Sequence, residues 1–271
     1  MNIVITGAGG VLCSAFSRAL AADGHKIALL DLNLEAAERE AEGIRKAGGE
    51  AIAVQANVLD KESLKKAHDV VLEEFGPCEV LINGAGGNNP KGTTTSEYFS
   101  KEDMLDENAR SFFDLDQDGV SFVFNLNFLG TLLTTQAFAT DMLETGGCLV
   151  NISSMNAFTP LTKIPAYSGA KAAVSNFTQW LAVHFANCNI RVNAIAPGFF
   201  ATNQNRTLLF NEDGSLTPRS HKIISQTPMG RFGKPEELLG TLRFLIDNDA
   251  SGFVTGITIP VDGGFSAYSG V

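Results

Sequence analysis

The sequence has no cluster of basic residues. Of its 271 residues, 20 are lysine or arginine and 30 are aspartate or glutamate, which gives a formal net charge of −10. A protein that binds the phosphate backbone of a nucleic acid needs concentrated positive charge on its surface. The composition therefore argues against a nucleic-acid partner.

The sequence also has no long hydrophobic run. No apolar stretch approaches the roughly 20 residues that a helix needs to cross a bilayer, so we expect no membrane partner. The first residues already have the pattern of a strand followed by glycines. We therefore expect no signal peptide and a cytoplasmic location.

Cysteine is scarce and unpaired in the sequence. The four cysteines, Cys13, Cys78, Cys148 and Cys188, lie far apart and form no C-x-x-C pair. This spacing predicts reduced thiols rather than disulfides. No set of histidine, cysteine, aspartate and glutamate has metal-ligand spacing, and we expect no metal.

Short apolar runs alternate with longer amphipathic segments along the chain. The runs are continuously apolar, which is typical of parallel strands covered on both faces. The alternation predicts one α/β domain over residues 1–271, with a Rossmann-type doubly wound parallel sheet of about seven strands. We expect strands at 2–6, 26–31, 51–55, 79–83, 148–153, 191–195 and 256–260, and helices near 11–23, 34–47, 61–75, 119–144, 165–187 and 235–247.

Two segments interrupt this alternation, residues 88–118 and residues 199–231. The first is rich in Asn, Thr, Glu and Asp, and the second shows little strand pattern. Long segments of this kind in a compact domain are usually functional. Because ligands bind beyond the carboxyl ends of parallel strands, we expect both segments to act as substrate loops.

A glycine-rich turn, Gly7, Gly9 and Gly10, follows the first predicted strand and leads into a helix. Such a turn lets the backbone approach a pyrophosphate at a helix N-terminus. Asp31 ends the second predicted strand, where a carboxylate can accept both ribose hydroxyls of NAD and repel the extra phosphate of NADP. The alternatives are a plain tight turn and an aspartate that caps the next helix.

A second run of small residues, from Asn83 through Gly84 and Ala85, follows the fourth predicted strand. It would let a dinucleotide lie across the edge of the sheet. Asn57 follows the third predicted strand and could bond an adenine ring or simply form a turn. These positions agree with a cofactor site at the carboxyl edge.

Tyr167 and Lys171 lie one helical turn apart, with Ser154 thirteen residues before the tyrosine. Residues i and i+4 share one face of a helix, so the phenol and the ammonium can point into one pocket. An ammonium about 4 Å from the phenol would favour the phenolate by roughly 4 kcal/mol, or about three pKa units. We therefore expect Lys171 to bring the pKa of Tyr167 from about 10 toward neutrality, with Ser154 as a hydrogen-bond donor to a carbonyl oxygen.

These motifs together resemble the short-chain dehydrogenase/reductase family over nearly the whole chain. The matching segments are the first glycine turn, Asn83–Gly86, Asn127, Ser154, Tyr167–Lys171, Arg191–Gly198 and Val261–Gly264. The resemblance implies hydride transfer between a nicotinamide and a carbonyl or alcohol. Tyr167 would be the proton donor, Lys171 would hold the nicotinamide ribose, and Asn127 would hold a water that relays protons, unless it is a plain packing amide.

The resemblance also implies a set of NAD-binding residues and an assembly. We expect a homotetramer in which the segments 119–144 and 165–187 pair between subunits. The family has glycine where this chain has Val11 and Cys13, which could restrict the approach of phosphate. The expected cofactor-binding residues are Gly7, Gly9, Gly10, Val11, Leu12, Asp31, Asn57, Val58, Asn83, Gly84, Ala85, Tyr167, Lys171, Pro197, Gly198 and Thr202.

Amides and hydroxyls are frequent in the expected substrate loops, which suits a polyhydroxylated substrate better than a steroid or an acyl chain. Asn88 and Asn156 are candidate substrate residues, although asparagine is also a common turn residue. A cation could pair with a sugar-acid carboxylate. Lys91 and Arg206 are the candidates carried forward, with Lys163 and Arg219 also open.

Two stretches narrow the resemblance further, residues 88–92 and residues 153–163. Within the family they resemble bacterial D-mannonate oxidoreductases, also called fructuronate reductases. We therefore expect a sugar-acid substrate, with D-mannonate and D-fructuronate as the pair. The alternatives are a dehydrogenase of another polyol or aldonate such as gluconate, and a non-catalytic protein that senses NAD.

Overall fold

A parallel β-sheet forms the centre of the computed structural model, which describes residues 1–201 and 206–270 except for the side chains of Arg206 and Leu208. In this described part the sheet has seven strands in the order β3-β2-β1-β4-β5-β6-β7. All neighbouring pairs are parallel, which confirms the expected doubly wound sheet. The strands are β1 (Asn2–Thr6), β2 (Lys26–Asp31), β3 (Glu50–Gln55), β4 (Val80–Asn83), β5 (Gly147–Ile152), β6 (Ile190–Pro197) and β7 (Thr258–Val261).

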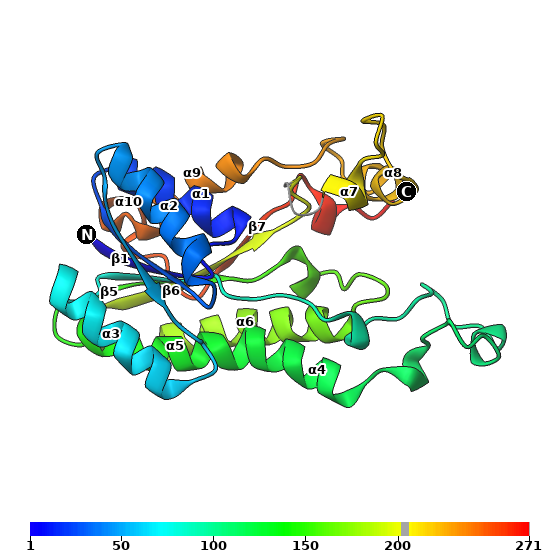
Figure 1. Cartoon of the computed structure of the whole chain (residues 1–271), viewed down its shortest axis with the longest axis horizontal. Helices are drawn as coiled ribbons and strands as arrows, with labels where there is room; N and C mark the ends of the chain where they lie inside the picture. The colour runs from blue at the N-terminus through cyan, green and yellow to red at the C-terminus, as the bar shows by residue number, and fades with distance from the viewer. Residues whose placement is uncertain (202–205, 271) are drawn as a thin grey trace.

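Helices cover both faces of the sheet (Figure 1). One layer contains α1 (Val11–Ala22), α2 (Leu34–Lys46), α9 (Leu239–Ile246) and α10 (Asn248–Ser251). The opposite layer contains α3 (Lys61–Phe75), α4 (Gln117–Phe124), α5 (Gly130–Phe138) and α6 (Pro165–His184). Two short helices, α7 (Arg206–Leu209) and α8 (Pro218–Ser225), lie near the C-terminus, away from both layers.

The side-chain alternation of the strands divides the interior into two hydrophobic cores. In β1, Ile3 and Ile5 pack toward α1, α2 and α9, whereas Val4 packs toward α3, α5 and α6. All three side chains are fully buried. Successive residues of a strand point to opposite faces, so a continuously apolar strand supplies both cores at once.

The strand order reverses direction between β1 and β4. The chain builds β1, β2 and β3 outward on one side and then returns to place β4 beside β1. In open parallel sheets a ligand crevice forms at the carboxyl ends of the strands at such a point. The glycine turn after β1 and the small residues after β4 therefore meet at this crevice.

The two segments that interrupt the strand and helix alternation are linked to each other. Glu97 of the 88–118 segment and Lys222 of α8 form an ion pair with a 2.6 Å separation. The main-chain N–H of Thr94 donates a 2.8 Å hydrogen bond to the carbonyl oxygen of Lys163. Part of the 88–118 segment extends well beyond the helices at the right of Figure 1.

Among the described helices, none has both the length and the apolar composition to span a bilayer.

Candidate active site

The glycine turn forms a close-packed cradle between β1 and α1. Gly7 has a φ of +66°, and a Cβ atom at this position would lie 2.9 Å from the Cα atom of Ala85. Gly10 precedes α1, and no side chain caps the free N–H groups of that helix. Uncapped N–H groups at a helix N-terminus attract an anion. The turn therefore has the shape and polarity that a pyrophosphate needs, and Val11 and Leu12 begin the helix that faces it.

Asp31 at the end of β2 holds the glycine turn in place. Its Oδ2 accepts a 2.9 Å hydrogen bond from the N–H of Gly9, and its Oδ1 accepts one of 2.9 Å from the N–H of Asn33. The side chain that caps α2 is Asn33 and not Asp31, because Asn33 Oδ1 accepts from Ala36 N. Each carboxylate oxygen keeps a further lone pair for another donor. The carboxylate thus lies beside the cradle, where a ribose would bind.

Cys13 replaces a family glycine without entering the cradle. Its side chain is buried and contacts the Cα region of Gly84, where a Cβ atom would overlap the sulfur. Thr6 Oγ1 accepts hydrogen bonds from the N–H groups of Gly84 and Ala85, at 3.1 and 3.2 Å. The absence of a side chain at Gly84 therefore provides the room that Cys13 needs. Burial raises the pKa of the Cys13 thiol to about 12, so the thiol stays protonated.

The other expected cofactor residues differ in how their side chains are used. Asn57 Oδ1 accepts a 3.0 Å hydrogen bond from Leu59 N, which is the turn role considered above. Val58 is buried, and its Cγ2 would lie only 2.9 Å from a Cβ atom at Gly130 of α5, so it packs closely against that helix. The amide of Asn83 is buried: its Nδ2 donates to Thr135 Oγ1 and Asn151 Oδ1, and its Oδ1 has no hydrogen-bond partner in the described part of the chain.

The loop after β6 also reaches the carboxyl edge of the sheet. Gly198 follows Pro197, and its N–H donates a 3.0 Å hydrogen bond to Val261 O at the end of β7. A Cβ atom at Gly198 would lie 2.6 Å from the Cα atom of Asp262, so only glycine allows this close approach. Thr202, which the sequence also predicts in this loop, lies outside the described residues.

Ser154, Tyr167 and Lys171 converge at the carboxyl end of β5. Ser154 lies close enough to the phenol of Tyr167 to lower the pKa of that phenol. Lys171 Nζ lies 5.6 Å from the centroid of the Tyr167 ring and donates a 2.7 Å hydrogen bond to Ile152 O. Lys171 is 4 % exposed. Since β5 ends at Ile152, one strand end positions the serine and also orients the lysine.

The expected effect of Lys171 on Tyr167 is wrong in this structure. Burial raises the pKa of Tyr167 to about 12, and the side chain of Ser154 offsets only part of that rise. Burial also lowers the pKa of Lys171 to about 8. The ammonium bonds to Ile152 O instead of the phenol, and desolvation disfavours the charged form of both groups.

Asn127 joins the loop after β4 to the neighbourhood of Lys171. Its Nδ2 donates to Gly87 O at 2.7 Å and Val123 O at 2.8 Å, and its Oδ1 accepts from Gly87 N at 3.2 Å. Asn127 lies in a π-helical turn, Asn125–Leu129, between α4 and α5, where a single helix over 119–144 was expected. Such turns often occur at functional sites.

Gly86 belongs to the second run of small residues, but the sequence alone indicates no role for it. A Cβ atom at Gly86 would lie 2.6 Å from Asn127 Oδ1 and 3.2 Å from Lys171 Nζ. The absence of a side chain there lets the asparagine and the lysine approach each other. The second run of small residues indicates a need for glycine here. Only the contacts with Asn127 and Lys171 explain why a side chain is excluded at this position.

The predicted substrate residues are not all brought together. Asn156 is buried, and its N–H donates a 3.2 Å hydrogen bond to Ser154 Oγ, directly beside the Ser154–Tyr167 pair. Asn88 and Lys91 are exposed, and Asn88 Nδ2 donates to Thr93 Oγ1 at 3.2 Å. The side chain of Arg206 lies outside the described part of the chain.

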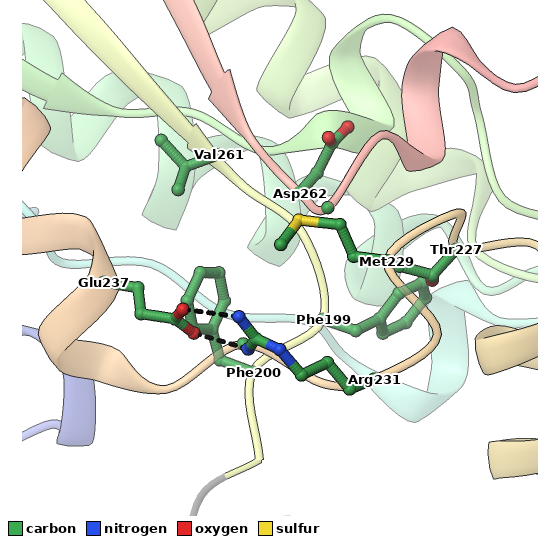
Figure 2. Close-up of a pocket in the computed structure, with 10 residues that line it drawn as sticks. Phe199, Phe200, Thr227, Met229, Arg231, Glu237, Val261 and Asp262 are labelled. Carbon is green, nitrogen blue, oxygen red and sulfur yellow. Dashed lines mark hydrogen bonds and ion pairs between the residues drawn. The ribbon is translucent and has the colours of Figure 1, made fainter.

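A separate small cavity lies at the ends of β6 and β7. Figure 2 shows Arg231 in this cavity, paired through two 2.7 Å hydrogen bonds with Glu237. The guanidinium lowers the pKa of Glu237 to about 2. Ser154, Tyr167 and Lys171 do not line this cavity.

Among the described residues, no group of three or more His, Cys, Asp or Glu side chains could hold a metal ion.

The fold and these residues agree with the comparisons to known proteins. A family model described as enoyl-(acyl carrier protein) reductase matches residues 8–266. The chain belongs to the short-chain dehydrogenase/reductase family and is an oxidoreductase.

The chain is similar over nearly its whole length to two other oxidoreductases and to one solved structure. The chain is 61 % identical over 270 residues to an uncharacterized oxidoreductase of Haemophilus influenzae, covering 99 % of this chain and 94 % of that one. It is 54 % identical over 269 residues to an uncharacterized oxidoreductase, UxuB, of Bacillus subtilis, covering 99 % and 95 %. A Haemophilus influenzae protein provisionally called a D-mannonate oxidoreductase, solved with bound NAD, has a TM-score of 0.95 and 60 % identity, covering 99 % and 96 %.

Proposed function

We propose that this protein is an NAD-dependent dehydrogenase that interconverts a hydroxyl and a ketone of a sugar acid, with D-mannonate and D-fructuronate as the pair. The observation that carries the proposal is the convergence of Ser154, Tyr167 and Lys171 beside a glycine cradle. The substrate pair is supported by the solved relative at 60 % identity.

The cradle fits a dinucleotide. Its glycines leave space that Cβ atoms would fill, and the N-terminus of α1 has no competing side-chain cap. Asp31 lies beside the cradle through its bond to Gly9, and a carboxylate there favours the free ribose of NAD over the phosphorylated ribose of NADP. When bound, NAD accepts a hydride from the alcohol carbon, or returns one as NADH.

Tyr167 would supply the proton in the reduction direction. Its raised pKa keeps the phenol protonated at neutral pH, so it can donate to an oxygen that is gaining negative charge. Ser154 Oγ accepts the N–H of Asn156, which leaves its own proton free to point toward the phenol or the reacting oxygen. In the oxidation direction Tyr167 must lose its proton, and a cation near the phenol would then lower its pKa.

Lys171 would provide positive charge in this buried site. Its lowered pKa of about 8 still leaves the ammonium mostly protonated at neutral pH. Its bond to Ile152 O fixes the direction in which Nζ points. The role of Asn127 in a proton relay remains a prediction, and its two bonds to Gly87 support a role in positioning the loop against Lys171.

Two other functions remain as alternatives. Dehydrogenation of another aldonate is supported by a 2-dehydro-3-deoxy-D-gluconate 5-dehydrogenase of Escherichia coli, which is 31 % identical over 266 residues and covers 97 % of this chain and 94 % of that one. A non-catalytic NAD sensor was suggested by the departures at Val11 and Cys13. The inward packing of Cys13 makes the sensor the weaker alternative.

The test is a substrate panel with the purified protein. D-mannonate and gluconate are offered with NAD⁺ or NADP⁺, and D-fructuronate and 5-ketogluconate with NADH or NADPH, with absorbance at the NADH band as the readout. We expect the highest kcat/KM with D-mannonate and D-fructuronate and with the unphosphorylated cofactor. A higher value for gluconate or 5-ketogluconate would favour the first alternative. Calorimetric NAD binding without turnover of any substrate would favour the sensor.

We also propose that the protein assembles as a homotetramer through α5 and α6. The groove between these helices is apolar and lined in part by Leu132, Phe177, Trp180 and Phe185. Trp180 is 55 % exposed, and Val183 on the same helix is 80 % exposed. Exposed apolar surface of this kind usually marks an interface. Pairing of these helices between subunits would cover it.

A further inference from the structure

Asn156 carries a buried polar atom without a partner. The side chain is 4 % exposed, and its Oδ1 has no hydrogen-bond partner in the described part of the chain. An unpaired buried carbonyl is costly, so such an atom calls for an explanation. A donor that arrives with the substrate would satisfy it.

The position of Asn156 indicates which donor that is. Asn156 lies in the turn Met155–Ala157, two residues after Ser154, and its N–H bonds to Ser154 Oγ. The side chain of Ser154 in turn lies beside the phenol of Tyr167 and lowers the pKa of that phenol. If the reacting oxygen of the substrate reaches these two hydroxyls, as the proposed function requires, Asn156 would lie near the carbons next to the reacting one. In a sugar acid those carbons carry hydroxyl groups.

The other buried polar atoms without partners differ from Asn156. They are Asn83 Oδ1, Thr134 Oγ1 and Ser168 Oγ. Asn83 lies in the sheet–helix interface, bonded through its Nδ2, and Thr134 lies on α5. Ser168 follows Tyr167 on α6, but its main-chain N–H bonds back to Ile164 O. Of these four residues, Asn156 alone in the described structure has a hydrogen bond to Ser154, through its main-chain N–H.

We propose that Asn156 Oδ1 accepts a hydrogen bond from the substrate hydroxyl on a carbon next to the reacting carbon, and so selects α-hydroxy ketones over plain ketones. This inference rests on the proposed dehydrogenase function. An acceptor that is left unpaired by a deoxy substrate penalises that substrate, whereas a merely apolar pocket discriminates poorly. Asn156 therefore determines specificity, while its N–H positions Ser154.

The experiment measures kcat/KM for D-fructuronate and for its two deoxy analogues, each with hydrogen in place of the hydroxyl on one carbon next to the ketone. The wild type is expected to prefer D-fructuronate over one analogue by about 10- to 100-fold. Asn156→Leu should lose that preference by turning over D-fructuronate more slowly, with the rate for that analogue nearly unchanged. Asn156→Asp keeps an acceptor oxygen and should keep most of the preference.

The controls separate specificity from positioning and from folding. Asn108→Leu makes the same exchange at an exposed residue of the 88–118 segment and should leave the preference unchanged. NADH affinity and the thermal midpoint are measured for each variant, and Asn156→Ser replaces the leucine variant if the latter does not fold. An equal fall for all three ketones in the leucine or serine variant would overturn the inference and assign Asn156 to Ser154 positioning alone.

Two wild-type results have distinct meanings. Reduction of D-fructuronate and both analogues at equal kcat/KM would overturn the role of Asn156 and leave the proposed function intact. No reduction of D-fructuronate, with NADH binding retained, would overturn the proposed substrate and this inference with it.

Discussion

The thiol of Cys13 lies against the Cα atom of Gly84, in the space that a side chain at residue 84 would need. A cysteine at a position where the family has glycine is therefore accommodated by a glycine on the neighbouring strand end. The contact lies beneath the cradle, next to Thr6, whose hydroxyl accepts both Gly84 N and Ala85 N. One pair of residues thus decides how closely the loop after β4 approaches the turn after β1.

Gly84→Ala should destabilise the protein through overpacking. The new Cβ atom would overlap Cys13 Sγ and lie 2.8 Å from Thr6 O, and we expect a loss of about 1–3 kcal/mol in the free energy of unfolding. Chemical denaturation measures the loss. The double variant Gly84→Ala with Cys13→Gly should recover part of it, since the contact with Thr6 O remains. Equal losses with and without Cys13 would show that the thiol is not the obstacle.

Tyr167→Phe should reduce turnover at least a thousandfold. Removal of the phenol hydroxyl removes the proposed proton donor, and general acid–base catalysis typically contributes about 10²–10⁴-fold. The ring and its packing remain, so NADH should still bind, as measured by fluorescence titration. Near-normal kcat in this variant would contradict the proposed role of Tyr167.

Asp31→Ala should relax the preference for NAD over NADP. The change removes a carboxylate that would repel the ribose phosphate, and we expect the ratio of kcat/KM values to shift by about tenfold or more toward NADP, where tenfold corresponds to about 1.4 kcal/mol. Asp31→Asn removes the charge but keeps an acceptor oxygen for Gly9 N, which separates repulsion from the loss of that bond. A wild-type enzyme that already prefers NADPH would refute the assignment of Asp31.

Cys148 should make the protein less stable at alkaline pH. Burial raises the pKa of its thiol from 9.0 to about 11. Between these values the unfolded chain has lost the proton and the folded chain has kept it, so the thiol's contribution is complete below pH 9 and is lost as pH rises to 11. The expected slope is about 1.4 kcal/mol per pH unit.

The corresponding measurement is chemical denaturation of the wild type and Cys148→Ser between pH 8 and pH 11. The difference in unfolding free energy between the two proteins should shift in favour of the variant by that slope. Cys188→Ser makes the same exchange at a half-buried site and reports the effect of the substitution outside the core. A difference that does not change with pH would contradict the burial argument for Cys148.

Val183→Asp should break the proposed tetramer into smaller species. Val183 is 80 % exposed on α6, and burial of a new carboxylate in a helix–helix interface is costly. Light scattering gives the mass of each species. Val70→Asp, at an exposed position on α3, is the matched control and should leave the mass unchanged. A monomeric mass for the wild type would refute the proposed tetramer.

Local patterns in the sequence were enough to predict the layered fold. The apolar runs predicted seven strands, and the observed ends differ from the predicted ones by two residues or fewer. The glycine turn, Asp31 and the Tyr167–Lys171 spacing each depend on residues close in the chain or on strand ends, so their neighbourhood could be inferred. The long predicted helix over 119–144 is instead broken by the π-helical turn at Asn127, because its amide bonds to Val123 O and to Gly87 in another segment.

The sequence by itself determined the parallel sheet, the glycine cradle and which groups gather at its carboxyl edge, because strand periodicity and helical spacing are local properties. Only the tertiary structure decided the charge state of those groups, the direction of Lys171 toward Ile152 O and the isolation of Asn156 Oδ1. These depend on desolvation and on partners distant in the chain. No local pattern encodes how deeply a side chain is buried or what lies opposite it.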